Sequence, residues 1–133
     1  MSVIFGRNRH PLSILIRLFE WSRWSHCGIV VGDYVIESTS RDGVVRTHIN
    51  DFKKRYNSCK VAEIPCYPGY QERAEEMYGK PYDFGAIFGI MFRQGWSHNE
   101  KWFCSELIAH ASGIFREERI SRITPEDVWK VSC

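Results

Sequence analysis

The chain has 133 residues, of which 44% are hydrophobic and 26% charged, a composition typical of one globular domain with a packed core. Its formal net charge of +2 and short basic runs exclude a protein that binds nucleic acid mainly through positive charge. The apolar stretch 12–19 is interrupted by Ser13 and Arg17, and it is too short to span a bilayer. We therefore expect a single domain over residues 1–133 that forms no stable membrane span.

The cysteines indicate reduced thiols and no metal centre. The chain has five of them, an odd number, and no Cys-x-x-Cys pair occurs. This pattern suggests neither a disulfide framework nor a four-ligand zinc site, so we expect no cofactor. Residues 1–10 lack the charged-then-apolar order of a signal peptide. We therefore expect synthesis in the cytoplasm, with a separate device for any delivery to a virion or to the cell envelope.

The first half of the chain predicts a sheet. Pro11 suits the first turn of a helix that runs to about residue 21. The clearest β signal is a pair of β-rich runs joined by Gly32 and Asp33, which fit a type II′ hairpin turn. Asn50 is a candidate cap for a short helix over 49–56. The predicted strands are 2–5, 26–31, 34–39, 44–47 and 60–64.

The second half of the chain predicts mainly helices. Thr124, Pro125 and the two acids that follow form a strong helix start, with a capping hydroxyl and proline at the first position. Other helices are expected over 68–78, 84–92 and 103–114. Strands therefore lie centrally and helices flank them. The fold class is α+β, with an antiparallel sheet of about four to six strands packed against helices.

Cys104 lies at the start of the predicted helix 103–114, directly after a segment rich in polar and aromatic residues. A cysteine on the first turn of a helix has a lowered pKa, because unpaired N–H groups and the helix dipole stabilise the thiolate. Cys104 is therefore a candidate nucleophile at a helix N-terminus. The alternative is a small core hydrophobe, the usual role of a reduced cysteine.

A histidine and a carboxylate share one face of the predicted hairpin. Pairing the strands across the turn places Gly28 opposite Glu37 and His26 opposite Thr39. Because the side-chain period is two, His26 and Glu37 point to the same side as diagonal neighbours, and Gly28 should leave open space beside them. A carboxylate beside a histidine fixes its tautomer and supports the imidazolium. The alternative is a half-exposed polar pair without a catalytic role.

Four motifs then resemble those of the circularly permuted NlpC/P60 superfamily, the YiiX-like and LRAT-like papain-fold proteins. They are SHCGIV at 25–30, GKPYD at 79–83, FCSEL at 103–107 and TPED at 124–127. Their order, histidine strand first and cysteine helix later, is that of the permuted group, and they cover most of the chain from residue 25 onward.

The resemblance implies a papain-like fold over 1–133 and thiol chemistry on amide or ester bonds, with Cys104 as nucleophile and His26 as base. The third polar group varies in the superfamily, so Glu37 rests on the pairing argument. Tyr82 corresponds to a tyrosine often found near the thiol, where its hydroxyl binds the substrate oxygen or the sulfur; the alternative is a loop tyrosine packed in the core. Cys27 points away from His26 by strand parity, and we expect it to fill core space.

We therefore expect an amidase or endopeptidase that acts through a thioacyl intermediate on peptide or peptidoglycan stem amides. The backbone N–H of Cys104 and the hydroxyl of Tyr82 would hold the oxyanion. Two alternatives stay open: an acyltransferase or (thio)esterase acting on lipid or other acyl groups, and a non-enzymatic subunit of a phage tail or secretion particle with a vestigial thiol site. The sequence also leaves open whether residues 93–101 form a lid.

Overall fold

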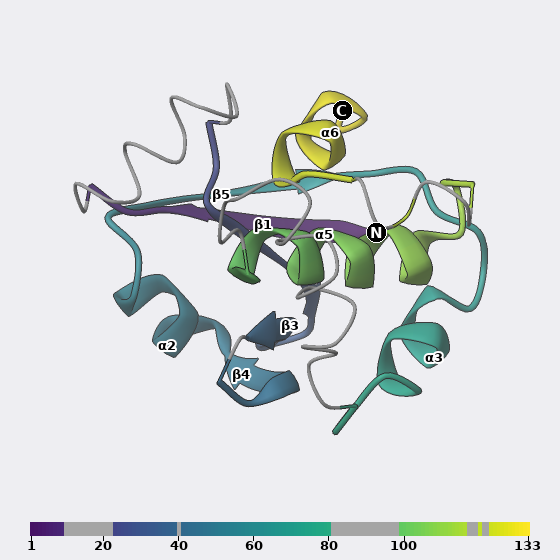
Figure 1. The fold of residues 1–133 in the computed structure, drawn as a ribbon, viewed down its shortest axis with the longest axis horizontal. Coiled ribbons are helices and arrows are strands. Elements are labelled where there is room, and N and C mark those ends of the chain that lie inside the picture. The colour runs from purple at the N-terminus through teal and green to yellow at the C-terminus, as the bar shows by residue number, and fades with distance from the viewer. Residues whose placement is uncertain (10–22, 40, 81–98, 117–119, 121–122) are drawn as a thin grey trace.

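The computed structural model describes residues 1–9, 23–39, 41–80, 99–116, 120 and 123–133, with the side chains of 99–103 outside the description. The helices predicted over 11–21 and 84–92 lie outside these residues. Within the described part, five strands form one sheet and four helices pack around it (Figure 1). The strands are β1 Ser2–Arg7, β2 His26–Val31, β3 Tyr34–Thr39, β4 Gly43–His48 and β5 Ser58–Glu63. The helices are α2 Ile49–Lys54, α3 Tyr70–Glu75, α5 Asn99–Ser112 and α6 Pro125–Lys130.

The sheet is antiparallel throughout, in the strand order β4-β3-β2-β1-β5. The predicted hairpin is confirmed, since Val31 pairs with Tyr34 and Ile29 pairs with Ile36. Gly32 takes a φ of 59°, the positive value that the first central residue of a type II′ turn requires. The α+β class and the antiparallel sheet expected from the sequence are therefore both present.

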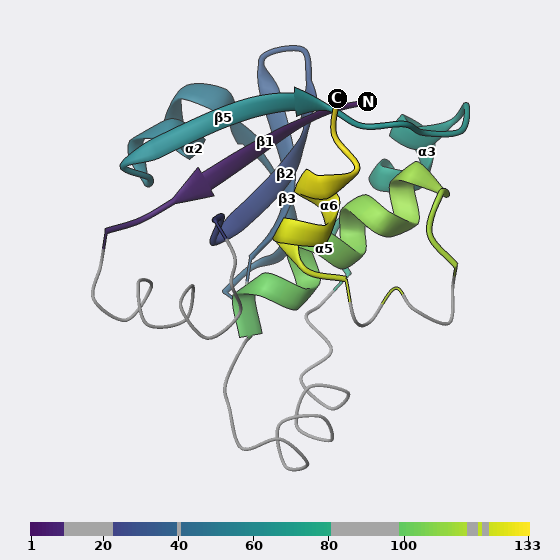
Figure 2. The same ribbon diagram turned by 90° about the horizontal axis from the view of Figure 1, so that it is seen from above.

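Different helices pack on the two faces of the sheet (Figure 2). On one side, which we call the α5 face, α5 and α6 cover the odd-numbered residues of β1 and β2, which include Val3, Phe5, Cys27 and Ile29. The other side, the α2 face, buries Ile4, Val35 and Phe52, with Val30, Ile49, Tyr56 and Cys59 packed around them. The alternation follows from the two-residue period of a strand. Each fully buried large apolar side chain stabilises the fold by about 1.5–3 kcal/mol.

The predicted start of α6 is confirmed by a complete capping box. The Thr124 hydroxyl accepts the Asp127 N–H, and the Asp127 carboxylate accepts the Thr124 N–H. Its opposite end leads to the C-terminus, which meets the N-terminal region beside β1 and β5 (Figure 2). At the end of α5, the Arg73 guanidinium on α3 donates to the carbonyl of buried Ala111 at 2.9 Å, and so pairs one of the carbonyl groups that the end of a helix leaves unbonded.

Several predicted boundaries were wrong in ways that matter for the site. The short helix α2 is capped by His48 and not by Asn50, because the His48 Nδ1 accepts the N–H of Asn50 at 3.2 Å. The helix predicted over 103–114 begins earlier, at Asn99, and ends at Ser112. The first strand continues through Gly6 to Arg7, because Gly6 pairs with both β2 and β5 and Arg7 pairs with β5.

No helix among the described residues has both the length and the apolar character needed to cross a bilayer. Within the same residues, no group of three or more histidine, cysteine and acidic side chains is arranged to hold a metal ion.

Candidate active site

His26 opens β2 and is fixed in place from its backbone to its ring. Its neighbour Ser25 donates both its N–H and its hydroxyl to the Gly6 carbonyl, which anchors the start of the strand. The residue is only 5% exposed. It stacks against Tyr56, with ring centroids 5.8 Å apart and planes 11° apart, and against Phe52 at 5.8 Å and 27°. The ring plane of His26 is therefore set by α2 and the residues that follow it.

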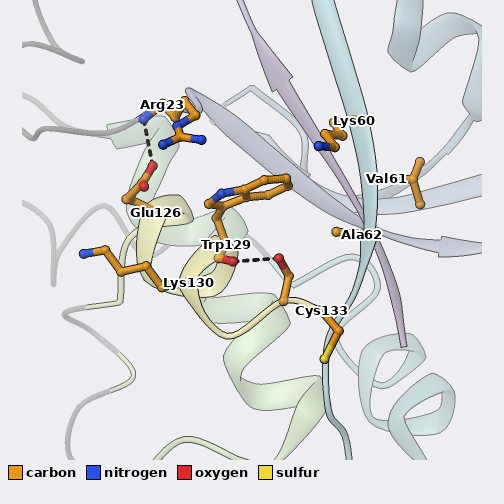
Figure 3. A pocket seen from close by; sticks show the side chains of 9 residues that line it. Arg23, Lys60, Val61, Ala62, Glu126, Trp129, Lys130 and Cys133 are labelled. Atoms are coloured by element: carbon orange, nitrogen blue, oxygen red, sulfur yellow. Dashed lines mark hydrogen bonds between the residues drawn. The ribbon is translucent and has the colours of Figure 1, made fainter.

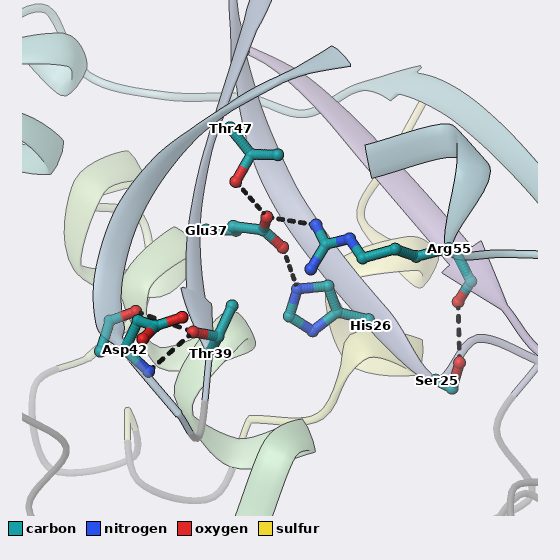
Figure 4. A network of polar contacts seen from close by, with 9 residues as sticks. Ser25, His26, Glu37, Thr39, Asp42, Thr47 and Arg55 are labelled. Atoms are coloured by element: carbon teal, nitrogen blue, oxygen red, sulfur yellow. Dashed lines mark hydrogen bonds and ion pairs between the residues drawn. The ribbon is translucent and has the colours of Figure 1, made fainter. Parts of the chain in front are cut away.

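Glu37 lies on the neighbouring strand β3 and meets His26 as the hairpin pairing predicted (Figure 4). The His26 Nε2–H donates to Glu37 Oε2 at 2.8 Å. The second oxygen, Oε1, accepts the Thr47 hydroxyl at 2.6 Å and forms an ion pair with the Arg55 guanidinium. Glu37 is fully buried, so the alternative of a half-exposed polar pair is wrong.

These contacts keep the carboxylate of Glu37 ionised. Burial alone would raise the pKa of Glu37, but the hydrogen bond and charge of His26, the Thr47 hydroxyl and the Arg55 charge together lower it. The carboxylate then holds Nε2 of His26, which leaves Nδ1 as the ring nitrogen available to a partner on the other side. A fixed tautomer of this kind is what a catalytic histidine requires.

That partner is Cys104 of α5, which packs fully buried against β2 and β3. Burial alone would raise the pKa of the Cys104 thiol, but a hydrogen bond from Cys27, together with the charge and hydrogen bond of His26, holds it well below its usual range. Burial would also lower the pKa of His26, yet Cys104 and Glu37 raise it to about 10. The two groups therefore form a thiolate–imidazolium pair at neutral pH.

The position of Cys104 within α5 corrects one expectation. Because the helix begins at Asn99, Cys104 lies in its second turn and not on the first. The helix dipole acts mainly within the first turn, so the thiolate depends on His26 and Cys27. Only the first four N–H groups of a helix lie outside its hydrogen-bonded ladder. The N–H of Cys104 falls beyond them, which contradicts its expected place as an exposed oxyanion donor.

Two further expectations for the hairpin were incomplete. Gly28 does not open a space, because a Cβ at this position would press against Val35 and lie only 3.1 Å from the Ile36 carbonyl oxygen. The glycine instead permits β3 to approach closely. Cys27 is buried as predicted, but its thiol is also hydrogen-bonded to Cys104. Burial raises the pKa of Cys27, so this thiol stays protonated and serves as a donor.

The sequence interpretation missed three residues near the pair. Thr47 and Arg55 bind Glu37, as described above. Glu106 lies two positions after Cys104 and is half-buried; burial and the charge of Cys104 raise the pKa of its carboxyl to about 7. Tyr82 lies outside the described residues, so its predicted role stays a prediction. The same holds for residues 93–98 of the candidate lid, whereas 99–101 form the first turn of α5.

A separate groove of about 600 Å³ lies between β5 and α6 (Figure 3). The Trp129 side chain forms part of its wall, and Lys60 and Lys130 lie at its rim. Its lining includes none of His26, Glu37 and Cys104. The groove is therefore not the place where the thiolate and imidazolium meet.

Comparison with known families agrees with this geometry. A model of permuted papain-like amidase enzymes, the YaeF/YiiX or C92 family, matches residues 2–119. The chain belongs to this family. The match spans all five strands and α5, and so includes His26, Glu37 and Cys104. This C92 protein is thus a cysteine peptidase or amidase-type hydrolase with a papain-like fold. Neither a curated protein nor a solved structure matches the chain.

Proposed function

We propose that this C92 family member hydrolyses amide bonds in peptides through a thioacyl intermediate on Cys104, and that peptidoglycan stem peptides are its substrates. The observation that carries the proposal is the contact of Cys104 with a buried imidazolium, His26, whose Nε2 is held by Glu37 at 2.8 Å. Nucleophile, base and orienting carboxylate are the parts of a cysteine hydrolase.

In the proposed first half-reaction, the Cys104 thiolate attacks the carbonyl carbon and the carbonyl oxygen becomes an oxyanion. When the tetrahedral intermediate collapses, the C–N bond breaks and the His26 imidazolium gives its Nδ1 proton to the departing amine. The acyl group remains on sulfur as a thioester. We propose the Tyr82 hydroxyl as the oxyanion donor, in place of the Cys104 N–H that α5 draws into its own ladder.

In the second half-reaction, neutral His26 takes a proton from water, and the hydroxide attacks the thioester. The C–S bond breaks, the carboxylic acid leaves, and the thiolate–imidazolium pair is restored. The ionised Glu37 stabilises the imidazolium in both steps without changing its own protonation state. An amine or alcohol in place of water would make the same intermediate an acyl donor.

The substrate class rests on two supports. The family is one of amidases, which favours an amide bond. The resemblance of the four motifs to the permuted NlpC/P60 group favours the short peptides of the cell wall. Such a substrate lies in the cell envelope, so the proposal includes delivery there, as part of a virion or of a bacterial assembly.

The test uses purified protein with muropeptides and with a generic activated ester. We expect release of a new amine and carboxylate from muropeptides by the wild type, and loss of this activity in Cys104→Ala. Cys133→Ala removes an exposed thiol far from the site and should behave as the wild type. Added hydroxylamine should trap the thioacyl enzyme as a hydroxamate. Activity that survives in Cys104→Ala would remove the mechanism, and hydrolysis of the ester without the muropeptide would remove the substrate class.

A further inference from the structure

The α2 region supplies three side chains to the back of the His26–Glu37 pair. Phe52 lies in α2, Arg55 caps its end and Tyr56 follows, and the ring centroids of Phe52 and Tyr56 are 4.9 Å apart. The Arg55 guanidinium lies 5.3 Å from the ring centroid of Phe52 and 5.7 Å from that of Tyr56. These are the same two rings on which His26 stacks.

The contacts of the carboxylate show what Arg55 adds there. Oε2 of Glu37 is bound by His26, while Oε1 is shared by the Thr47 hydroxyl and Arg55 (Figure 4). Thr47 is a neutral donor, so Arg55 is the permanent positive charge on this carboxylate. The Arg55 side chain is 42% exposed, whereas Glu37 is fully buried. Arg55 therefore reaches from solvent, across two aromatic rings, to a buried anion.

A fully buried carboxylate without a cationic partner tends to take up a proton. With a proton on Glu37, the attraction that holds a positive charge on His26 would weaken. Among the described residues, the other titratable groups near this pair or near Arg55 are Cys104 and Glu106 on α5, Cys27 on β2, Cys59 on β5, Tyr56, and Asp51 and Lys53 on α2. Lys53 is the one cation in this group, and its charge acts on Cys59, whereas the charges that lower the pKa of Glu37 are those of His26 and Arg55.

We propose that Arg55 is a positioning residue, which acts through Glu37 to keep the carboxylate ionised and so holds His26 as an imidazolium facing Cys104. The inference rests on the proposed roles of His26 and Cys104, and it extends the site to a residue of α2. The ion pair of Arg55 is with Glu37 and not with the thiol or the imidazole. Its effect should therefore appear in the pH dependence of thiol reactivity.

The experiment measures the alkylation rate of Cys104 by iodoacetamide from pH 4 to pH 9, with peptide mass spectrometry to separate the five cysteines. Arg55→Met removes the charge but keeps an unbranched chain over Phe52 and Tyr56. We expect its alkylation profile to move to higher pH by about one unit, which makes alkylation about tenfold slower at pH values below the midpoint of the wild-type profile. Arg55→Lys should recover at least half of this loss, because it restores the positive charge.

Two controls make the interpretation specific. Lys54→Gln removes the neighbouring cation of α2, which pairs only with exposed Asp51 among the described residues, and should leave the profile unchanged. In a Glu37→Gln background, Arg55→Met should cause no further shift, because its route of action is gone. If Arg55→Met fails to fold, Arg55→Gln replaces it in both backgrounds, with thermal unfolding as the check.

The outcomes separate this inference from the proposed function. A reactive wild type with an unchanged profile in folded Arg55→Met or Arg55→Gln would overturn the role of Arg55 alone. An equal shift in the Glu37→Gln background would also overturn it, because Arg55 would then act by another route. A wild type whose Cys104 is unreactive at pH 6 would overturn both the inference and the thiol mechanism. Failure to cleave muropeptides with reactive Cys104 would leave the role of Arg55 intact and remove only the substrate.

Discussion

The two faces of the sheet surround their buried charges differently. On the α2 face, buried Glu37 is bound by a histidine, a hydroxyl and a guanidinium, so both of its oxygens are paired. On the α5 face, the charge of Cys104 is set among apolar side chains and depends on His26 and Cys27. The carboxylate is thus bound by an imidazole, a hydroxyl and a guanidinium, while the sulfur interacts with the imidazole of His26 and with the thiol and backbone of Cys27.

Strand β2 joins these two environments. His26 and Cys27 are consecutive, and their side chains belong to opposite faces, yet both interact with Cys104. His26 connects the thiol to the charged network of Glu37, and Cys27 connects it to the apolar core. We therefore expect a substitution on the α2 face to affect Cys104 through the imidazole of His26. A substitution on the α5 face should affect the sulfur of Cys104 directly.

Removing the imidazole of His26 should have the largest effect on the hydrolysis rate, because this ring connects Cys104 to Glu37. We expect His26→Ala to lower the hydrolysis rate by about 10²–10⁴-fold, the usual contribution of a general acid–base group. The Cys104 thiol should also lose its low-pH reactivity toward iodoacetamide. His110→Ala, a change of an exposed imidazole near the end of α5, is the matched control and should retain activity. Full activity in His26→Ala would show that the two faces are not connected through this ring.

The pH dependence of hydrolysis should show the second largest effect. The pKa of His26 is raised from 6.5 to about 10, so the proton needed by the departing amine is present up to that value. We expect the rate to fall about tenfold per unit once the pH rises through 10. The stability gained from the raised pKa of His26 is complete below about 6.5 and is lost as the pH rises through 10. A rate that falls between pH 7 and 8 would contradict this assignment.

Neutralising the carboxylate should give an intermediate effect. Glu37→Gln keeps the shape of the side chain but removes the anion that supports the imidazolium. We expect hydrolysis to slow by about ten- to a hundredfold and its alkaline limit to move to lower pH, because the pKa of His26 falls. Steady-state rates across pH measure both changes. Glu63→Gln alters a largely exposed carboxylate on β5 and serves as the control.

Replacing the thiol of Cys27 should have the smallest effect on the reactivity of Cys104. This change tests the α5 face alone. Cys27→Val removes the donor to Cys104 at similar volume, and we expect alkylation of Cys104 to slow by roughly threefold to tenfold at pH values below the midpoint of the wild-type profile. Cys27→Ser keeps a donor and should stay closer to the wild type. Cys59→Val changes a cysteine packed on the α2 face and should leave the reactivity of Cys104 as it was. Equal slowing in the valine variants of Cys27 and Cys59 would remove the distinction between the faces.

Local rules determined much of this protein from its sequence. The hairpin register, and with it the contact between His26 and Glu37, follows from a two-residue turn and a two-residue period. Thr47 could have been found the same way, since it lies opposite Val35, one step diagonal from Glu37. The capping box at Thr124 likewise depends on only four consecutive residues, so the sequence alone predicts it.

Only the tertiary structure decided the rest, because it depends on elements that meet far along the chain. Arg55 reaches Glu37 only after α2 folds back under the sheet, and no pattern in its own segment indicates that contact. Strand parity placed Cys27 correctly on the α5 face, but the position of Cys104 against it required the packing of α5. The start of α5 at Asn99 moved the nucleophile away from the helix end. The sequence thus determined the contact between His26 and Glu37. Long-range packing determined which groups stabilise the thiolate of Cys104.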